Sequence, residues 1–170
     1  PRPDAFETLA AAPCMLAWSV HSANDELRRQ LVPTHSTFTA VELREGLRKA
    51  LAARPAARTR TLMIAATLIA GVNDRDQDAR DLAAFVGPLV DTCVKVNLDL
   101  IPVNPTAHAP HFKKPSRDRL AAFASVLRAV EPRAHVAVRL TRGDDENAAC
   151  GQLLISSSSP RSSRRSRSSQ

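Results

Sequence analysis

The chain has 170 residues and a formal net charge of +7, and its residues are 44% hydrophobic but only 4% aromatic. This length predicts one domain, or a large part of one, with a core built mainly from alanine, leucine and valine. We expect no membrane partner and no signal peptide, because no run of about 18 apolar residues occurs and no basic stretch leads into an apolar one. The first residue is Pro1 rather than methionine, so we expect the chain to be part of a longer protein.

Apolar runs and helix patterns alternate along the chain. In order, the sequence predicts a strand at 14–20, helices at 23–31 and 39–53, a strand at 60–70, a helix at 76–86, a strand at 92–105, a helix at 115–130 with Ser116 as its cap, and a strand at 135–140. The strands are too uniformly apolar to alternate, which predicts an α/β fold with a parallel sheet covered by helices. Four strands would form half of an eight-stranded barrel or an open sheet, and the pattern favours neither.

The end of the chain differs in composition from the rest. Residues 156–170 contain nine serines and four arginines and no acidic residue, which predicts a disordered tail. Without the tail the net charge falls to +3, a value that is compatible with a nucleic-acid partner but does not require one. We therefore divide the chain into a leading segment at 1–13, a domain at 14–155 and the tail at 156–170.

The three cysteines lie far apart, at Cys14, Cys93 and Cys150. Their odd number and wide spacing argue against a disulfide framework and against a Cys-x-x-Cys metal site, so we predict no metal ligands in this chain. Free thiols are typical of a reducing compartment, which favours the cytoplasm or, in a eukaryote, the interior of an organelle. Cys14 and Cys93 fall in strand patterns, and we expect both to be core residues.

Polar residues follow each predicted strand. In parallel α/β folds, ligands bind at the carboxyl ends of the strands, so these residues are candidates for one common site. Each of them is also a residue type that forms turns, which is the alternative explanation for its position. The candidates are Ser19 and His21 after the first strand, Asn73 and Asp74 after the second, Asn104 after the third, and residues 142–145 after the fourth.

Five segments of the chain, taken in order, resemble one protein family. They read SVHSANDELRRQLVP, GVND, NLDLIPVNP, KKPSRDRLAAF and TRGDDENAACGQL. Their order and spacing are similar to those of the radical S-adenosylmethionine adenine-C2 RNA methyltransferases, the RlmN/Cfr group, which modify 23S ribosomal RNA and, in some members, transfer RNA. The resemblance runs from about Met15 to Leu153. It implies a partial TIM-type barrel of six strands, of which this chain matches the C-terminal two thirds.

The resemblance also implies which residues bind the cofactor. In the family, the Ser-x-His segment contacts S-adenosylmethionine, and it corresponds here to Ser19, Val20 and His21. The asparagine of the family's Asn-Pro pair contacts the same cofactor and corresponds to Asn104. The cysteine of AACGQL corresponds to Cys150, which would carry the methyl group as an intermediate.

A methyl carrier suits this chemistry, because C2 of adenine is an electron-poor carbon without a nucleophilic lone pair. The first transfer needs a thiolate at Cys150, which nearby positive charge would favour. Arg139 and Arg142 lie close in the sequence, but Asp144 and Asp145 oppose them, so the pattern predicts no net effect on the thiol.

The family's iron–sulfur cluster has no ligands in this chain. The resemblance implies a 4Fe-4S cluster held by a Cys-x-x-x-Cys-x-x-Cys loop, which the three separate cysteines cannot form. The family's second catalytic cysteine and its N-terminal RNA-binding region are also absent from these residues. We therefore expect the chain to need the missing N-terminal part of the same protein as its partner, with ribosomal RNA, and in some members transfer RNA, as substrate.

Two departures from the family leave other interpretations open. The strand before GVND lacks a carboxylate at about Ala65, and NLDLIP is two residues longer than the usual NLIP. The first alternative is therefore a non-catalytic RNA-binding or accessory remnant of the family. The second is a radical enzyme with a small-molecule substrate, which the RGDD and AACGQL segments disfavour.

Overall fold

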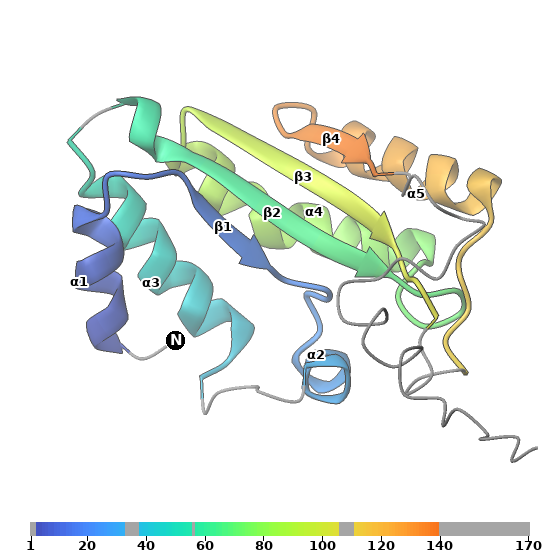
Figure 1. Cartoon of the computed structure of the whole chain (residues 1–170). Helices are drawn as coiled ribbons and strands as arrows, with labels where there is room; N and C mark the ends of the chain where they lie inside the picture. The colour runs from blue at the N-terminus through green and yellow to red at the C-terminus, as the bar shows by residue number, and fades with distance from the viewer. Residues whose placement is uncertain (1–2, 33–37, 56, 106–110, 140–170) are drawn as a thin grey trace, which may run out of the picture.

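The computed structural model describes residues 3–32, 38–55, 57–105 and 111–139 (Figure 1). The elements are α1 (Pro3–Ala11), β1 (Leu16–Ser19), α2 (Asp25–Leu31), α3 (Ala40–Ala52), η1 (Ala57–Arg60), β2 (Thr61–Leu68), α4 (Asp76–Thr92), β3 (Lys95–Pro102), α5 (Arg117–Val130) and β4 (His135–Val138). The strands form a sheet in the order β1-β2-β3-β4, and every neighbouring pair is parallel. The predicted α/β class with a parallel sheet is confirmed, whereas the tail at 156–170 lies outside the described residues.

Side-chain caps determine where three of the helices begin. Asn24 before α2 and Ser116 before α5 each accept a hydrogen bond from the backbone amide three residues later, at 3.0 and 3.1 Å. Before α3, the hydroxyl of Thr39 accepts a bond from the amide of Glu42. In return, the carboxylate of Glu42 accepts a bond from the amide of Thr39 at 2.8 Å. Each cap gives a partner to an amide that the helix itself leaves unpaired. These starts agree with the capping signals in the sequence.

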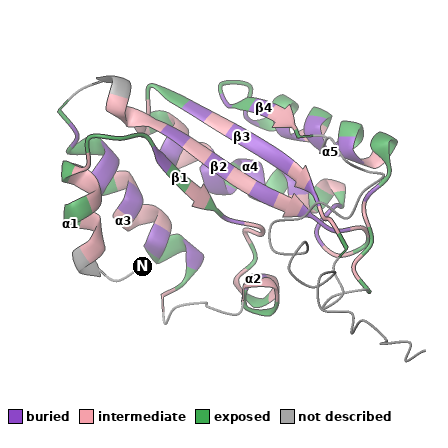
Figure 2. Cartoon of the chain, viewed as in Figure 1, coloured by how far each residue is buried: buried purple, intermediate pink, exposed green. Residues whose placement is uncertain are grey.

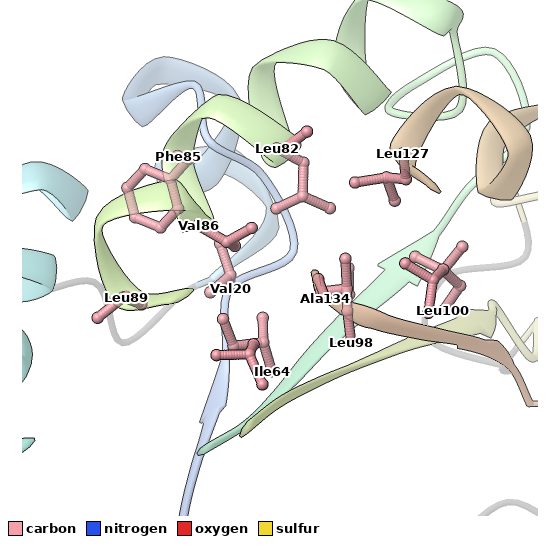
Figure 3. Close-up of a cluster of buried hydrophobic side chains, with 14 of the residues drawn as sticks. Val20, Ile64, Leu82, Phe85, Val86, Leu89, Leu98, Leu100, Leu127 and Ala134 are labelled. Atoms are coloured by element: carbon pink, nitrogen blue, oxygen red, sulfur yellow. The ribbon is translucent and has the colours of Figure 1, made fainter. Parts of the chain in front are cut away.

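The core lies between one face of the sheet and the helices behind it (Figure 2). Alternate residues of β2 are buried, and the close-up shows side chains of α4 and α5 facing those of the strands (Figure 3). The other residues of β2 are half-buried and point to the opposite face of the sheet. No helix of the described part lies across that face (Figure 1). We call this second surface the open face of the sheet.

Helix α1 lies where the sequence predicts only a leading segment. It packs against α3, and the approach is so close that a Cβ at Gly46 would lie 2.6 Å from Cζ of Phe6. The buried Arg54 also donates hydrogen bonds to backbone carbonyls at the end of α1. The division of the chain at residues 13 and 155 stays a prediction.

Helix α4 is longer than predicted. Its pattern ends at about residue 86 in the sequence, because Gly87 and Pro88 usually interrupt a helix. In the structure the helix continues to Thr92, since Leu89 is fully buried and its packing outweighs the local preference. None of the helices in the described ranges is long and apolar enough to cross a bilayer.

The predictions for two cysteines need correction. Cys14 is exposed, because β1 begins two residues later than the apolar run suggests, so its assignment to the core is wrong. Cys93 is half-buried at the C-cap of α4 and packs against the edge of the core. Burial raises the pKa of the Cys93 thiol to about 11.

Candidate functional site

His21, two residues after the end of β1, has an unusual backbone conformation. Its φ of 63° lies in the left-handed region, where no other non-glycine residue of the described chain is found. A side chain in this region costs conformational energy and persists where neighbouring contacts hold it. The ring atom Nδ1 accepts a hydrogen bond from the amide of Thr67 in β2 at 3.2 Å. The imidazole is thereby attached to the neighbouring strand.

Asn73 holds the same turn through its side-chain amide. The residue is only 2% exposed. Its Nδ2 donates to the carbonyl of His21 at 2.9 Å and to that of Thr67 at 2.8 Å, and its Oδ1 accepts from the amide of Ile69 at 2.7 Å. The asparagine of GVND therefore joins the ends of β1 and β2, a role beyond that of a turn former.

Asp74 has the more local role that its residue type suggests. Its carboxylate accepts a hydrogen bond from the amide of Gly71 at 2.9 Å, and Gly71 has a φ of 72° that suits glycine. The bond closes the GVND turn on itself. For Asp74, the turn-former explanation is the one that the geometry supports.

A pocket of about 180 Å³ lies beside this turn. Its lining is mostly apolar, with His21 as its titratable group, and consists of His21, Leu31, Thr67, Ile69, Val103 and Phe112. An apolar lining with few polar groups is typical of small-molecule sites. Burial, and then the positive charge of Arg28, lowers the pKa of His21. The imidazole in the pocket is therefore mainly neutral at pH 7.

Ser19 and Val20 precede His21 and differ in their surroundings. Ser19 is exposed on the open face, in register with Ala65 of β2. Val20 is fully buried in the core, and its amide donates to the carbonyl of Ala65 at 2.9 Å. Val20 could therefore meet a cofactor only through its backbone, and cofactor binding by either residue stays a prediction.

Asn104 follows β3 at the same end of the sheet. It is half-buried, and the preceding residue, Val103, lines the pocket that contains His21. The structure thus brings the segments of Asn104 and His21 together, as expected for carboxyl ends of parallel strands. A contact of Asn104 with a cofactor stays a prediction.

An ion pair lies on the open face, where Asp99 is in register with Ala65 of β2. Asp99 of β3, whose side chain is 8% exposed, accepts bonds from Nε and Nη2 of Arg139 at 2.8 and 2.7 Å. This carboxylate raises the pKa of the Arg139 guanidinium. Arg139 already has a carboxylate partner, so its charge is largely neutralised before it could act on Cys150.

Some candidates lie outside the described residues, and others were not found from the sequence. Cys150 and residues 142–145 belong to the first group. Within the ranges that the structure describes, no group of three His, Cys, Asp or Glu residues could hold a metal ion. Sequence reasoning did not identify Thr67 or Arg28. Thr67 is predictable in principle, because it ends a strand next to the candidate turn.

Sequence comparison relates the chain to a set of RNA-modifying enzymes. No family model matches it. It is 38% identical over 152 residues, 89% of this chain, to the dual-specificity RNA methyltransferase RlmN of Marinomonas sp., and covers 38% of that protein. It is 39% identical over 139 residues, 82% of this chain, to the RlmN of Marinobacter nauticus, and covers 35% of it. The chain thus spans little more than a third of the length of these relatives.

Structural comparison leads to the same group. A crystal structure of a radical SAM methyltransferase from Sphaerobacter thermophilus matches with a TM-score of 0.73 and 36% sequence identity. The match covers 89% of this chain and 41% of that one, and partial coverage of this extent fits the predicted correspondence to a C-terminal part. The chain therefore belongs to the RlmN family of radical S-adenosylmethionine methyltransferases.

Proposed function

We propose that this chain is the C-terminal part of an enzyme that methylates C2 of adenine in 23S ribosomal RNA, and in transfer RNA if it shares the dual specificity of its relatives. The similarity to proteins named RlmN over 89% of the chain carries the proposal. The pocket at the carboxyl ends of β1–β3 supports it, because that is where a parallel sheet presents its ligand site. The cytoplasm, or the interior of an organelle, remains the proposed compartment.

The residues around the pocket suit S-adenosylmethionine in their chemistry. An apolar lining with a neutral imidazole could contact an adenine ring without burying an unpaired charge. His21 and Asn104 would hold the cofactor with their side chains, Ser19 from the open face, and Val20 through its backbone. S-adenosylmethionine would supply the methyl group, and the sulfur of Cys150 would carry it.

The residues of this chain do not fit a 4Fe-4S cluster. Its three cysteines are separated by more than fifty residues each, so they cannot form a three-cysteine loop. The cluster ligands would come from the N-terminal part of the complete protein. We therefore propose that this chain is inactive without the N-terminal part.

Transfer of a labelled methyl group tests the proposal. We would express the complete reading frame that contains this chain, supply S-adenosylmethionine with a deuterated methyl group, and analyse tryptic peptides by mass spectrometry. The Cys150 peptide should carry the labelled methyl group, and methylated adenine should appear in 23S ribosomal RNA. Cys150→Ala should abolish both signals, whereas Cys14→Ala, which changes an exposed cysteine before β1, should retain them.

A result of the opposite kind would refute the proposal. If the Cys150 peptide remained unlabelled while the Marinomonas relative was labelled under the same conditions, Cys150 would not be a methyl carrier. The departures at Ala65 and in NLDLIP leave one alternative open, a non-catalytic RNA-binding remnant. Such a remnant would bind ribosomal RNA equally well with and without Cys150→Ala and would leave the RNA unmethylated.

A further inference from the structure

We infer that Asn73 is a positioning residue that fixes His21 as a neutral imidazole with its proton on Nε2, so that the pocket contains a hydrogen-bond donor for an uncharged acceptor atom of the ligand. The hydrogen bonds of Asn73 and His21 support this inference without any ligand. It rests on the proposed function only in naming S-adenosylmethionine, with its adenine and ribose acceptors, as the ligand.

The backbone of His21 needs an external constraint to remain in the left-handed region. The turn leaves its carbonyl oxygen without a partner in either strand, and Asn73 supplies one at 2.9 Å. The same amide group binds Thr67, the residue whose amide contacts the imidazole. Asn73 therefore holds the backbone of His21 and the amide of Thr67, which donates to the His21 ring, in a fixed relative position. A buried side chain with three hydrogen bonds is well suited to this, because its position has little freedom.

The hydrogen bond from Thr67 determines where the proton of the imidazole lies. A backbone N–H is a donor, so Nδ1 must offer its lone pair and cannot carry a hydrogen. In the neutral ring the proton is then on Nε2. Protonation to imidazolium would place N–H against N–H at Nδ1. Since Nδ1 is occupied, Nε2 is the nitrogen that remains for a ligand.

The charges around His21 are compatible with a neutral ring. Arg28 approaches from α2, and it lies three residues before Leu31, which lines the pocket. Asp78 and Asp81 of α4 line a second, small cavity that His21 also lines. The pKa of His21 is nevertheless lowered, by burial first and by Arg28 second, so the carboxylates do not dominate.

The test uses the 170-residue chain with ¹⁵N-labelled histidine and no ligand. At about pH 8, above the usual histidine pKa of about 6.5, the nitrogen shifts and long-range couplings of His21 should report a single tautomer protonated at Nε2. His21→Asn assigns the signals among the five histidines. Hydrogen exchange of the Thr67 amide gives a second, independent measurement.

Variants of the GVND turn separate positioning from general stability. Asn73→Leu removes all three side-chain hydrogen bonds without adding charge, and Asn73→Asp keeps the acceptor for Ile69 but loses both donors. Both should give a mixture of His21 tautomers and make the Thr67 amide exchange about tenfold faster. The matched control Asp74→Asn keeps an acceptor for Gly71 and should leave both signals unchanged. If Asn73→Leu does not fold, Asn73→Asp decides.

Three results would overturn the inference: a wild-type ring protonated on Nδ1, a His21 that titrates at or above the usual pKa, or Asn73 variants that behave like Asp74→Asn. The outcome is separate from that of the labelling experiment, because no cofactor takes part. A correct tautomer without methyl transfer would refute the proposed function alone. Labelled Cys150 with the wrong tautomer would refute this inference alone.

Discussion

Arg54 offers a sharp test of how the first helix is attached. The residue is 3% exposed and follows the C-cap of α3, and its guanidinium donates to the carbonyl oxygens of Leu9, at 2.9 Å, and of Ala12 and Cys14. These carbonyls lie at the C-terminal end of α1 and just after it, where a cation is favourable. We expect Arg54→Ala to release α1 from the rest of the fold.

The size of the effect follows from these three bonds. A hydrogen bond to a charged group contributes about 1.5–3 kcal/mol, but the carbonyls are only partly buried and water can replace the donor. Nε of Arg54 finds no partner among the described residues, which offsets part of the gain. We therefore expect Arg54→Ala to lower the free energy of unfolding by about 2–3 kcal/mol. A helix of nine residues is marginal by itself, so α1 should unfold when detached.

Urea unfolding followed by circular dichroism measures the loss, and hydrogen exchange of residues 5–11 locates it. The matched control is Arg48→Ala within α3, where a half-exposed pair with Glu45 at 2.9 Å should contribute less than about 0.5 kcal/mol. If Arg54→Ala cost no more than Arg48→Ala, or if exchange increased uniformly along the chain, the attachment of α1 by Arg54 would be wrong.

Two further predictions concern titratable side chains. Because burial raises the pKa of Cys93 to about 11, iodoacetamide at about pH 8 should label the exposed Cys14 at least about tenfold faster than Cys93, as measured by peptide mass spectrometry; equal rates would contradict the burial of Cys93. The lowered pKa of His21 means that, below about pH 6.5, the unfolded chain binds a proton that the folded chain does not. The free energy of unfolding should therefore fall as the pH drops from 7.5 through about 6.5, and this part of the fall should be missing in His21→Asn. An identical pH dependence in both proteins would refute it.

The order of strands and helices could be predicted because its signals are local. The caps Asn24, Thr39 and Ser116 act on amides within three residues, and the apolar residues of β2 and β3 lie close together in the sequence. The fold class followed from the same runs. Helix α1 could not be predicted in this way, since its attachment depends on Arg54, which is more than forty residues away.

The candidate site was predicted as a set of residues but not as an arrangement. The rule that ligands bind at the carboxyl ends of strands selected His21, Asn73 and Asn104, and the structure places all three at that end. The sequence could not distinguish the role of Asn73 from that of Asp74, because both are turn formers. The difference lies in a hydrogen bond that spans 52 residues. Likewise, Val20 matched the family motif although its side chain is packed in the core.

The two departures from the family that favour a degenerate remnant are neighbours in the sheet. Ala65, where a carboxylate is expected, is in register with Asp99, which belongs to the extended NLDLIP segment. Paired residues of parallel strands point to the same face and lie about 4.8 Å apart. The open face therefore still has a carboxylate beside position 65, on β3 instead of β2, and Arg139 binds it. The missing carboxylate at Ala65 is therefore not by itself evidence for a remnant, because the open face still has a paired carboxylate beside that position.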